Sequence, residues 1–160
     1  MSKEEFSIQP DASILGVFSR LNYKIWYAIA EFVDNSTQSF YSNENEFTKN
    51  GINSITVKVN YDIDNHELTI EDDAFGMNKK DFMRAVKLDS KPENQGGRNE
   101  FGMGLKTAAS WFGNTWSVES TEYGSNNKFF TEVNIELLKK EKLNTVYIET
   151  LKTDKERKQL

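Results

Sequence analysis

The sequence contains no cysteine, one histidine and no long apolar run among its 160 residues. Without cysteine the chain can form neither disulfides nor thiolate metal sites. Its apolar stretches are too short to cross a bilayer, and the polar start MSKEEFSIQP lacks the apolar core of a signal peptide. These absences predict a cytoplasmic protein with no membrane partner.

Neither sign of charge dominates any part of the chain. Lysine and arginine number 20, aspartate and glutamate number 25, and the net charge is −5. This interspersed balance argues against a segment that grips nucleic acid by itself. The length suffices for one domain with a sizeable core, so we expect residues 1–160 to form a single domain.

The spacing of apolar residues predicts helices segregated from pairs of strands. Helices are expected over 11–20, 22–42, 78–86 and 102–112, and strands over 54–62, 67–73, 115–123, 128–135 and 145–151. A polar joint is expected over 43–51 and a long loop over 87–101. This order indicates an α+β two-layer sandwich.

The stretch GRNEFGMGLKTAAS, residues 97–110, has the glycines of a phosphate loop but neither common pattern. Met103 stands where a P-loop has lysine, and Thr107 occupies the third glycine position of a dinucleotide motif. Gly102 and Gly104 would still let backbone amides approach an anion at the start of a helix. A simple glycine hinge is the alternative interpretation.

Two further clusters carry oxygen ligands. Glu31 and Asn35 are four residues apart and share one helical face. That face differs from the apolar face expected for Ile25, Ile29, Phe32, Ser36 and Phe40. A carboxylate can hold a water there and a carboxamide oxygen can hold a magnesium ion, whereas the alternative is a solvated polar face.

The second cluster is TIEDDAFGM, in which a strand ends in two aspartates and the chain turns at Gly76. A carboxylate at a strand end can accept a hydrogen bond from the exocyclic amine of adenine, and it would repel the carbonyl of guanine. Ordinary turn chemistry explains the same residues equally simply.

Together, AIAEFVDNS, DDAFGM and GGRNEFGMGLKTAAS resemble the three ATP-binding motifs of the GHKL superfamily. That superfamily contains DNA gyrase, the ninety-kilodalton heat-shock chaperones, histidine kinases and MutL, and the likeness is greatest to its MORC-type and related bacterial branch. It covers roughly residues 10 to 150. It implies a two-layer α/β sandwich with a mixed sheet of about five strands and helices on one face.

The resemblance also implies ATP and Mg²⁺ as ligands and gives the motif residues roles. Glu31 matches the general base and Asn35 the magnesium ligand. Asp72 matches the aspartate that reads adenine, Gly76 the glycine that admits the base, and Met77 a residue along the adenine.

On the phosphate side, Gly102 and Gly104 match glycines that lie against the phosphates, with Lys106 close by. Thr145 matches a threonine that assists adenine recognition through water. Residues 87–101 are expected to form a lid that is open without ligand and closes over ATP. The chain departs from the family pattern at Gln38, Ala74 and Asn144.

The expected function is therefore Mg-dependent ATP binding and hydrolysis that drives a conformational and dimerisation cycle. We expect an ATP-dependent homodimer, and an N-terminal fragment of a longer protein whose missing domains include a transducer and contact a nucleic acid or protein client. A non-hydrolysing, nucleotide-gated interaction module is the alternative. A histidine-kinase-type domain is disfavoured because the chain has only His66, in an expected turn.

Overall fold

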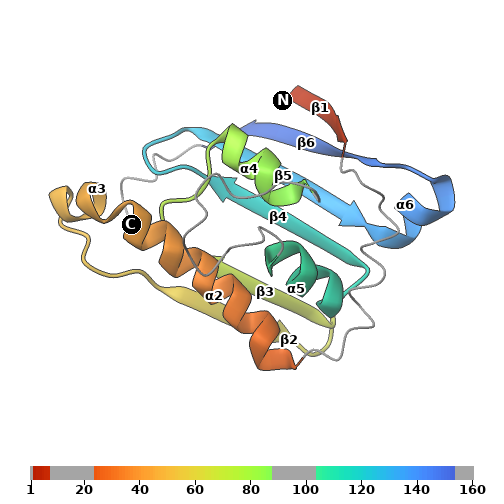
Figure 1. Cartoon of the computed structure of the whole chain (residues 1–160), viewed down its shortest axis with the longest axis horizontal. Helices are drawn as coiled ribbons and strands as arrows, with labels where there is room; N and C mark the ends of the chain where they lie inside the picture. Colours follow the sequence, from red (N-terminus) through yellow and green to blue (C-terminus); the bar gives the residue numbers. More distant parts are fainter. Residues whose placement is uncertain (1, 8–23, 88–103, 154–160) are drawn as a thin grey trace.

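The computed structural model describes residues 2–7, 24–87 and 104–153 (Figure 1). The expected helix over 11–20, Gly102 and all of the expected lid except Lys87 lie outside these residues. The elements run in the order β1 (Ser2–Ser7), α2 (Ile25–Ser42), α3 (Glu44–Lys49), β2 (Val57–Asp62), β3 (Glu67–Asp72), α4 (Lys79–Val86), α5 (Gly104–Phe112), β4 (Thr115–Thr121), β5 (Asn127–Asn134), α6 (Ile135–Glu141) and β6 (Thr145–Lys152).

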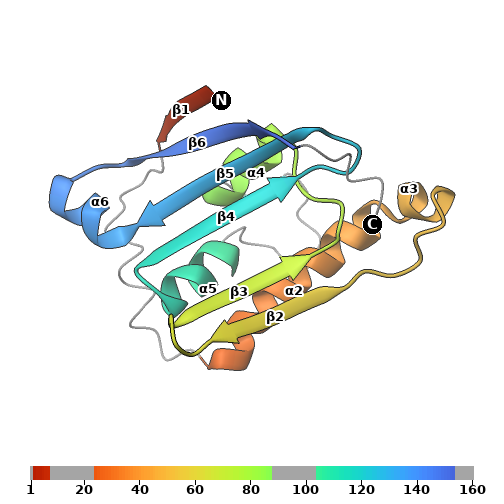
Figure 2. The ribbon, with the colours of Figure 1, turned by 180° about the vertical axis from the view of Figure 1, so that it is seen from behind.

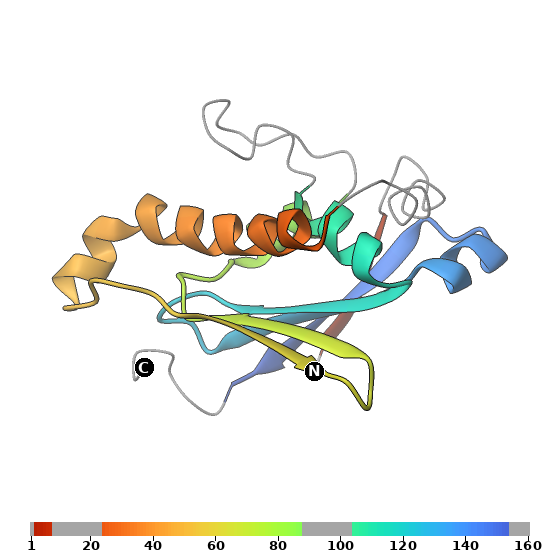
Figure 3. The ribbon, with the colours of Figure 1, turned by 90° about the horizontal axis from the view of Figure 1, so that it is seen from below.

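The strands form a four-stranded antiparallel sheet in the order β1-β6-β5-β4 and a separate β2-β3 hairpin. Figure 2 shows β3 beside β4 and running the same way, so the hairpin continues the layer of the larger sheet. Helices α2, α4 and α5 lie on one face of this layer (Figure 3). The predicted two-layer α+β architecture is confirmed.

The strand arrangement differs in detail from the single mixed sheet of about five strands that the family resemblance implied. Among the described strands β3 and β4 are not hydrogen-bonded to one another, and β1 adds a strand at the far edge. Strand β1 was not predicted from the sequence, because its polar residues show no alternation of apolar and polar positions. Contacts at the protein surface connect it to its neighbours. Lys3 lies 3.4 Å from Glu149 and 4.8 Å from the centre of the Tyr147 ring, and Glu4 pairs with Lys79 at 2.7 Å.

Two short helices replace expected irregular segments. Helix α3 forms in the polar joint, where Phe47 is its one buried residue. Helix α6 begins directly after β5, where the Asn134 side chain accepts a hydrogen bond from the Leu137 N–H, and it ends at Lys142 in the left-handed conformation. Asn78 caps α4, since its side chain accepts a hydrogen bond from the Asp81 N–H at 3.0 Å.

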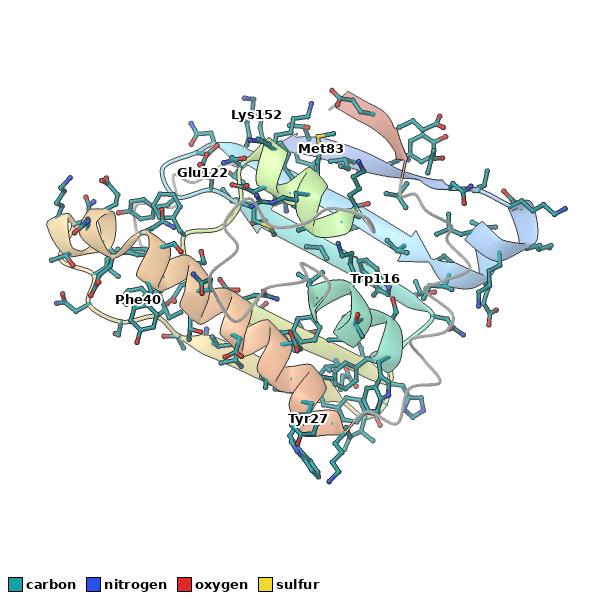
Figure 4. All side chains as sticks on the ribbon, in the orientation of Figure 1. Tyr27, Phe40, Met83, Trp116, Glu122 and Lys152 are labelled. Carbon is teal, nitrogen blue, oxygen red and sulfur yellow. The ribbon has the colours of Figure 1, made fainter. Side chains whose placement is uncertain are left out.

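The main core lies between α4 and the four-stranded sheet. Phe82 and Val86 of α4 pack with buried residues of β5, α6 and β6, and Met83 and Trp116 close the edge of this core (Figure 4). A second group, here called the aromatic cluster, joins α2, α3 and the ends of β3 and β4. Its members are Phe40, Phe47, Phe75 and Tyr123, with neighbouring ring centroids 5.3 to 5.7 Å apart.

Among the described residues, no helix combines the length and the apolar character that a membrane crossing needs.

Candidate functional site

The expected apolar face of α2 is turned inward except at its start. Ser36 is buried and Ile29, Phe32 and Phe40 are half-buried, whereas Ile25 is 57% exposed; Ala28 is also buried. Glu31 and Asn35 are half-buried. The helix packs against α5, and Phe32 meets Phe112 with ring centroids 6.4 Å apart. The polar pair therefore lies at a helix–helix contact, and the solvated-face interpretation does not hold.

Glu31 and Gly104 meet at this contact. A Cβ added to Gly104 would lie 2.1 Å from Oε2 of Glu31 and 3.1 Å from its Cδ. Only a residue without a side chain fits here while the carboxylate keeps its place. Because Gly104 is the first residue of α5, the Glu31 carboxylate lies at the positive end of that helix.

Asp72 is oriented by two donors. The Ser36 hydroxyl donates to Oδ2 at 2.9 Å, and the Ala74 N–H donates to Oδ1 at 3.0 Å. The residue itself remains exposed. Asp73 has a different task, because its Oδ1 accepts from the Thr56 N–H at 2.6 Å. The structure thus separates the two adjacent aspartates: Asp72 bonds to Ser36 of α2, whereas Asp73 bonds to the backbone just before β2.

Sequence analysis assigned Ser36 to the apolar face of α2 and gave it no role at the site. Its hydroxyl also donates to the Phe32 carbonyl at 3.1 Å, so it lies between its own helix and Asp72. The available signal was a serine directly after Asn35 in a stripe of otherwise large apolar residues.

The loop after Asp72 is held by hydrogen bonds with the end of β4 and the residues that follow it. Gly76 has φ 73°, which favours glycine, and the next N–H, of Met77, donates to Oγ of Ser120 at 2.9 Å. The Tyr123 N–H donates to the Phe75 carbonyl at 2.7 Å. Met77 packs against the main core.

Ala74 replaces a glycine of the family pattern without strain. Its φ is not positive, so its backbone conformation does not require glycine. The residue is 2% exposed, and its methyl group is therefore buried in the fold.

Lys106 lies two residues into α5 beyond Gly104, yet it is fully buried. Its ammonium donates a hydrogen bond to the carbonyl of Lys87, the residue that ends α4. In this structure Lys106 thus links α5 to the end of α4.

The structure does not bring Thr145 to this site. Thr145 is the first residue of β6, opposite Ser7 of β1. Strand β5 pairs its last residue, Asn134, with the start of β4, and it pairs Lys128 with Leu151 near the end of β6. The loop after Asp72 contacts the other end of β4, at Ser120. Because β4 and β6 run the same way, Thr145 lies at the sheet end remote from Asp72.

The residues present suit a magnesium ion bound together with phosphate. The described residues contain no group of three or more acidic, histidine or cysteine side chains able to enclose a metal. Magnesium usually keeps several waters and takes one or two protein oxygens plus phosphate oxygens. The Asn35 carboxamide, one turn from Glu31, is a donor of this kind.

Comparison with known families gives a match. Residues 23–159 match the family described as histidine kinase-, DNA gyrase B- and HSP90-like ATPase. The chain belongs to this family. Membership implies ATP binding. A comparison with curated proteins found no significant match.

Proposed function

We propose that this GHKL-type ATPase domain binds Mg-ATP and hydrolyses it, and that turnover drives a cycle of conformational change and dimerisation. The observation that carries the proposal is that α2 makes two contacts with other elements of the site. Glu31 contacts the first residue of α5, and Ser36 holds Asp72 at the end of β3. One helix therefore joins a carboxylate at a helix N-terminus to a carboxylate suited to adenine.

At the adenine end, Asp72 accepts a hydrogen bond from the exocyclic amine of adenine. Ser36 and the Ala74 N–H fix the direction of its carboxylate, and its exposure leaves it accessible to a ligand. Gly76 turns the chain so that the base can lie beside Met77. A guanine carbonyl at the same place would repel the carboxylate, so the site favours ATP over GTP.

At the phosphate end, the first N–H groups of α5 face the anion at Gly104. Gly102, outside the described residues, stays predicted to lie against the phosphates. Glu31 orients the attacking water and accepts its proton. Asn35 holds the magnesium ion, which when bound neutralises charge on the phosphate oxygens.

Three variants test these roles because each removes a different property. Glu31→Ala should retain ATP affinity but lose about a hundred- to ten-thousand-fold in turnover. Asn35→Ala should weaken Mg-ATP binding but leave adenosine binding unchanged. Asp72→Asn should reduce the preference for ATP over GTP, which we expect to be at least about tenfold in the wild type.

Calorimetry for affinity and phosphate release for turnover separate the outcomes. Glu46→Ala, an exposed carboxylate on α3, is the matched control and should change neither. Affinity and turnover lost together in Glu31→Ala would contradict a general base. Phosphate release equal to background in both wild type and Glu31→Ala would favour the non-hydrolysing module. The placement near the MORC-type branch remains a prediction.

A further inference from the structure

Strand β2 leaves one of its two edges unpaired. It pairs with β3 along its whole length, and within the described ranges no strand pairs with its other side. Figure 2 shows it at the outer edge of the layer. Large apolar side chains on β2 and directly after it are exposed to solvent: Val59 is 46% exposed, Tyr61 56% and Ile63 71%. An edge of this kind presents free backbone donors and acceptors to another strand.

The sequence of β2 is complementary to itself when reversed about Asn60. In an antiparallel pair centred on that residue, Val59 faces Tyr61 and Lys58 faces Asp62, and Val57 faces Ile63, the first residue of the turn after β2. Each pair occurs twice, because a two-fold axis through Asn60 repeats it. Pairs of aromatic with β-branched residues, and of opposite charges, are those that stabilise neighbouring strands.

We propose that β2 pairs antiparallel with β2 of a second copy of the chain, with the two Asn60 residues opposite one another on the two-fold axis. A lysine on an edge strand commonly prevents such pairing. Here Lys58 meets Asp62 of the other copy instead, so the charges select this register. A shift by one residue would place Lys58 opposite a hydrophobic side chain.

Side chains alternate between faces, and Asp72 opposite Val57 reaches Ser36 of α2, so Val59 and Tyr61 lie on the helix-covered face. Ser36 joins the middle of α2 to β3, one strand in from the edge, whereas the first turn of α2 reaches the outer edge of β2 (Figure 2). In the proposed pair the first turns of the two copies of α2 would therefore come close to one another at the two-fold axis.

The pairing does not depend on the proposed nucleotide function. The residues involved, 57–63, include none of the motif residues at the α2–α5 contact or at Asp72. Glu31→Ala and removal of nucleotide should therefore leave it unchanged, and failure of either proposal would not affect the other.

The absence of cysteine allows a direct test with single-cysteine variants of the 160-residue chain. Asn60→Cys places two thiols opposite one another across the axis. Lys58→Cys lies on the same face of the same strand but would be four residues from its own copy, and Thr69→Cys lies one strand farther in, opposite Asn60 on β3. Each protein is treated with a short bis-maleimide, and covalent dimer is followed on denaturing gels.

Asn60→Cys should form dimer roughly tenfold or more faster than either control, because pairing raises the local concentration of the two thiols. Adding Lys58→Glu to Asn60→Cys should slow cross-linking, since the new carboxylate would face Asp62 of the other copy. Adding Lys80→Glu instead, which makes the same charge change at an exposed position on α4, should not slow cross-linking. Equal rates for the three cysteine variants, or equal effects of the two charge reversals, would overturn the proposed register.

Discussion

At the scale of single residues, Gly104 and Glu31 are in direct contact. A methyl group on Gly104 must displace the Glu31 carboxylate. In a Glu31→Ala background the conflict disappears, and Gly104→Ala should be nearly neutral, because the gain in interior helix propensity applies only weakly at the first residue of α5. In the wild-type background the same substitution should be less favourable, because the carboxylate has to move.

A double-mutant cycle in urea measures the coupling between these two positions. We expect an interaction free energy of about 0.5–3 kcal/mol, as is usual for residues in contact. Additive effects of the two substitutions would show that the carboxylate does not occupy this place in solution.

Ser36 offers a test at the adenine end. Removing its hydroxyl takes away a donor that orients Asp72, so Ser36→Ala should weaken ATP binding by roughly tenfold, the size of a hydrogen bond to a charged group. The adjacent Thr37→Ala is the matched control, since that hydroxyl donates to the carbonyls of Val33 and Asp34. If calorimetry shows equal losses in both variants, the hydroxyl of Ser36 contributes only to the helix.

At the scale of elements, α3 is joined to the loop after Asp72 through the aromatic cluster. Phe47 is 1% exposed and touches Phe40, Phe75 and Tyr123. Phe47→Ala should lower the free energy of unfolding by about 3–5 kcal/mol. Tyr41→Ala, at a side chain 68% exposed on the same stretch of chain, should change it by less than about 0.5 kcal/mol. Similar small changes in both would mean that α3 is not anchored to the domain.

The turn between β2 and β3 gives a pH dependence. Hydrogen bonds from the side chain and then the backbone N–H of Asn65, with a further one from Asp64, hold the pKa of Asp62 below its usual range. A lowered folded-state pKa stabilises the native state above the ordinary value of about 3.9, and the stabilisation is lost as the pH falls through the folded-state value.

Unfolding of wild type and Asp62→Ala should therefore differ most at neutral pH and converge in acid. The measurement is the free energy of unfolding of both proteins from neutral pH to below about pH 3. A difference that is the same at every pH would exclude the carboxylate charge as its cause.

The elements that sequence analysis predicted are those with strong local patterns. The cap at Asn78 and the alternation of β2 to β6 are carried by neighbouring residues, and they placed these elements to within three residues. Strand β1 and helix α3 depend on partners distant in the chain, namely β6 and the aromatic cluster, so no local pattern marked them.

The same distinction applies to the site. Glu31, Asn35, Asp72 and Gly104 were selected because their spacing fits known motifs, and their roles remain predictions. Ser36 was missed because its partner, Asp72, is 36 residues away. Thr145 was assigned from a short pattern alone, and the end of the sheet at which it lies is decided by the number of antiparallel strands between it and β4.

At the scale of the whole molecule, the two proposals use different parts of one layer. The nucleotide residues lie where α2 meets α5 and the end of β3, whereas the proposed pairing uses the outer edge of β2. Pairing through β2 would place two nucleotide sites on the same face of one continuous sheet. Hydrolysis by one copy could then be compared with that of covalently joined copies without altering any motif residue.

Helix α2 also fixes the distance between the two ends of the proposed site. Glu31 and Ser36 are five residues apart, which corresponds to about 7.5 Å along a rigid helix axis. A ligand bound as proposed must match that length as well as carry the right base, because neither anchor can move without the other. Adenosine would satisfy one end only, and a molecule with a longer spacer between base and phosphates would miss one of them. Under the proposed function, the helix would select ligands by size and by identity in a single binding event.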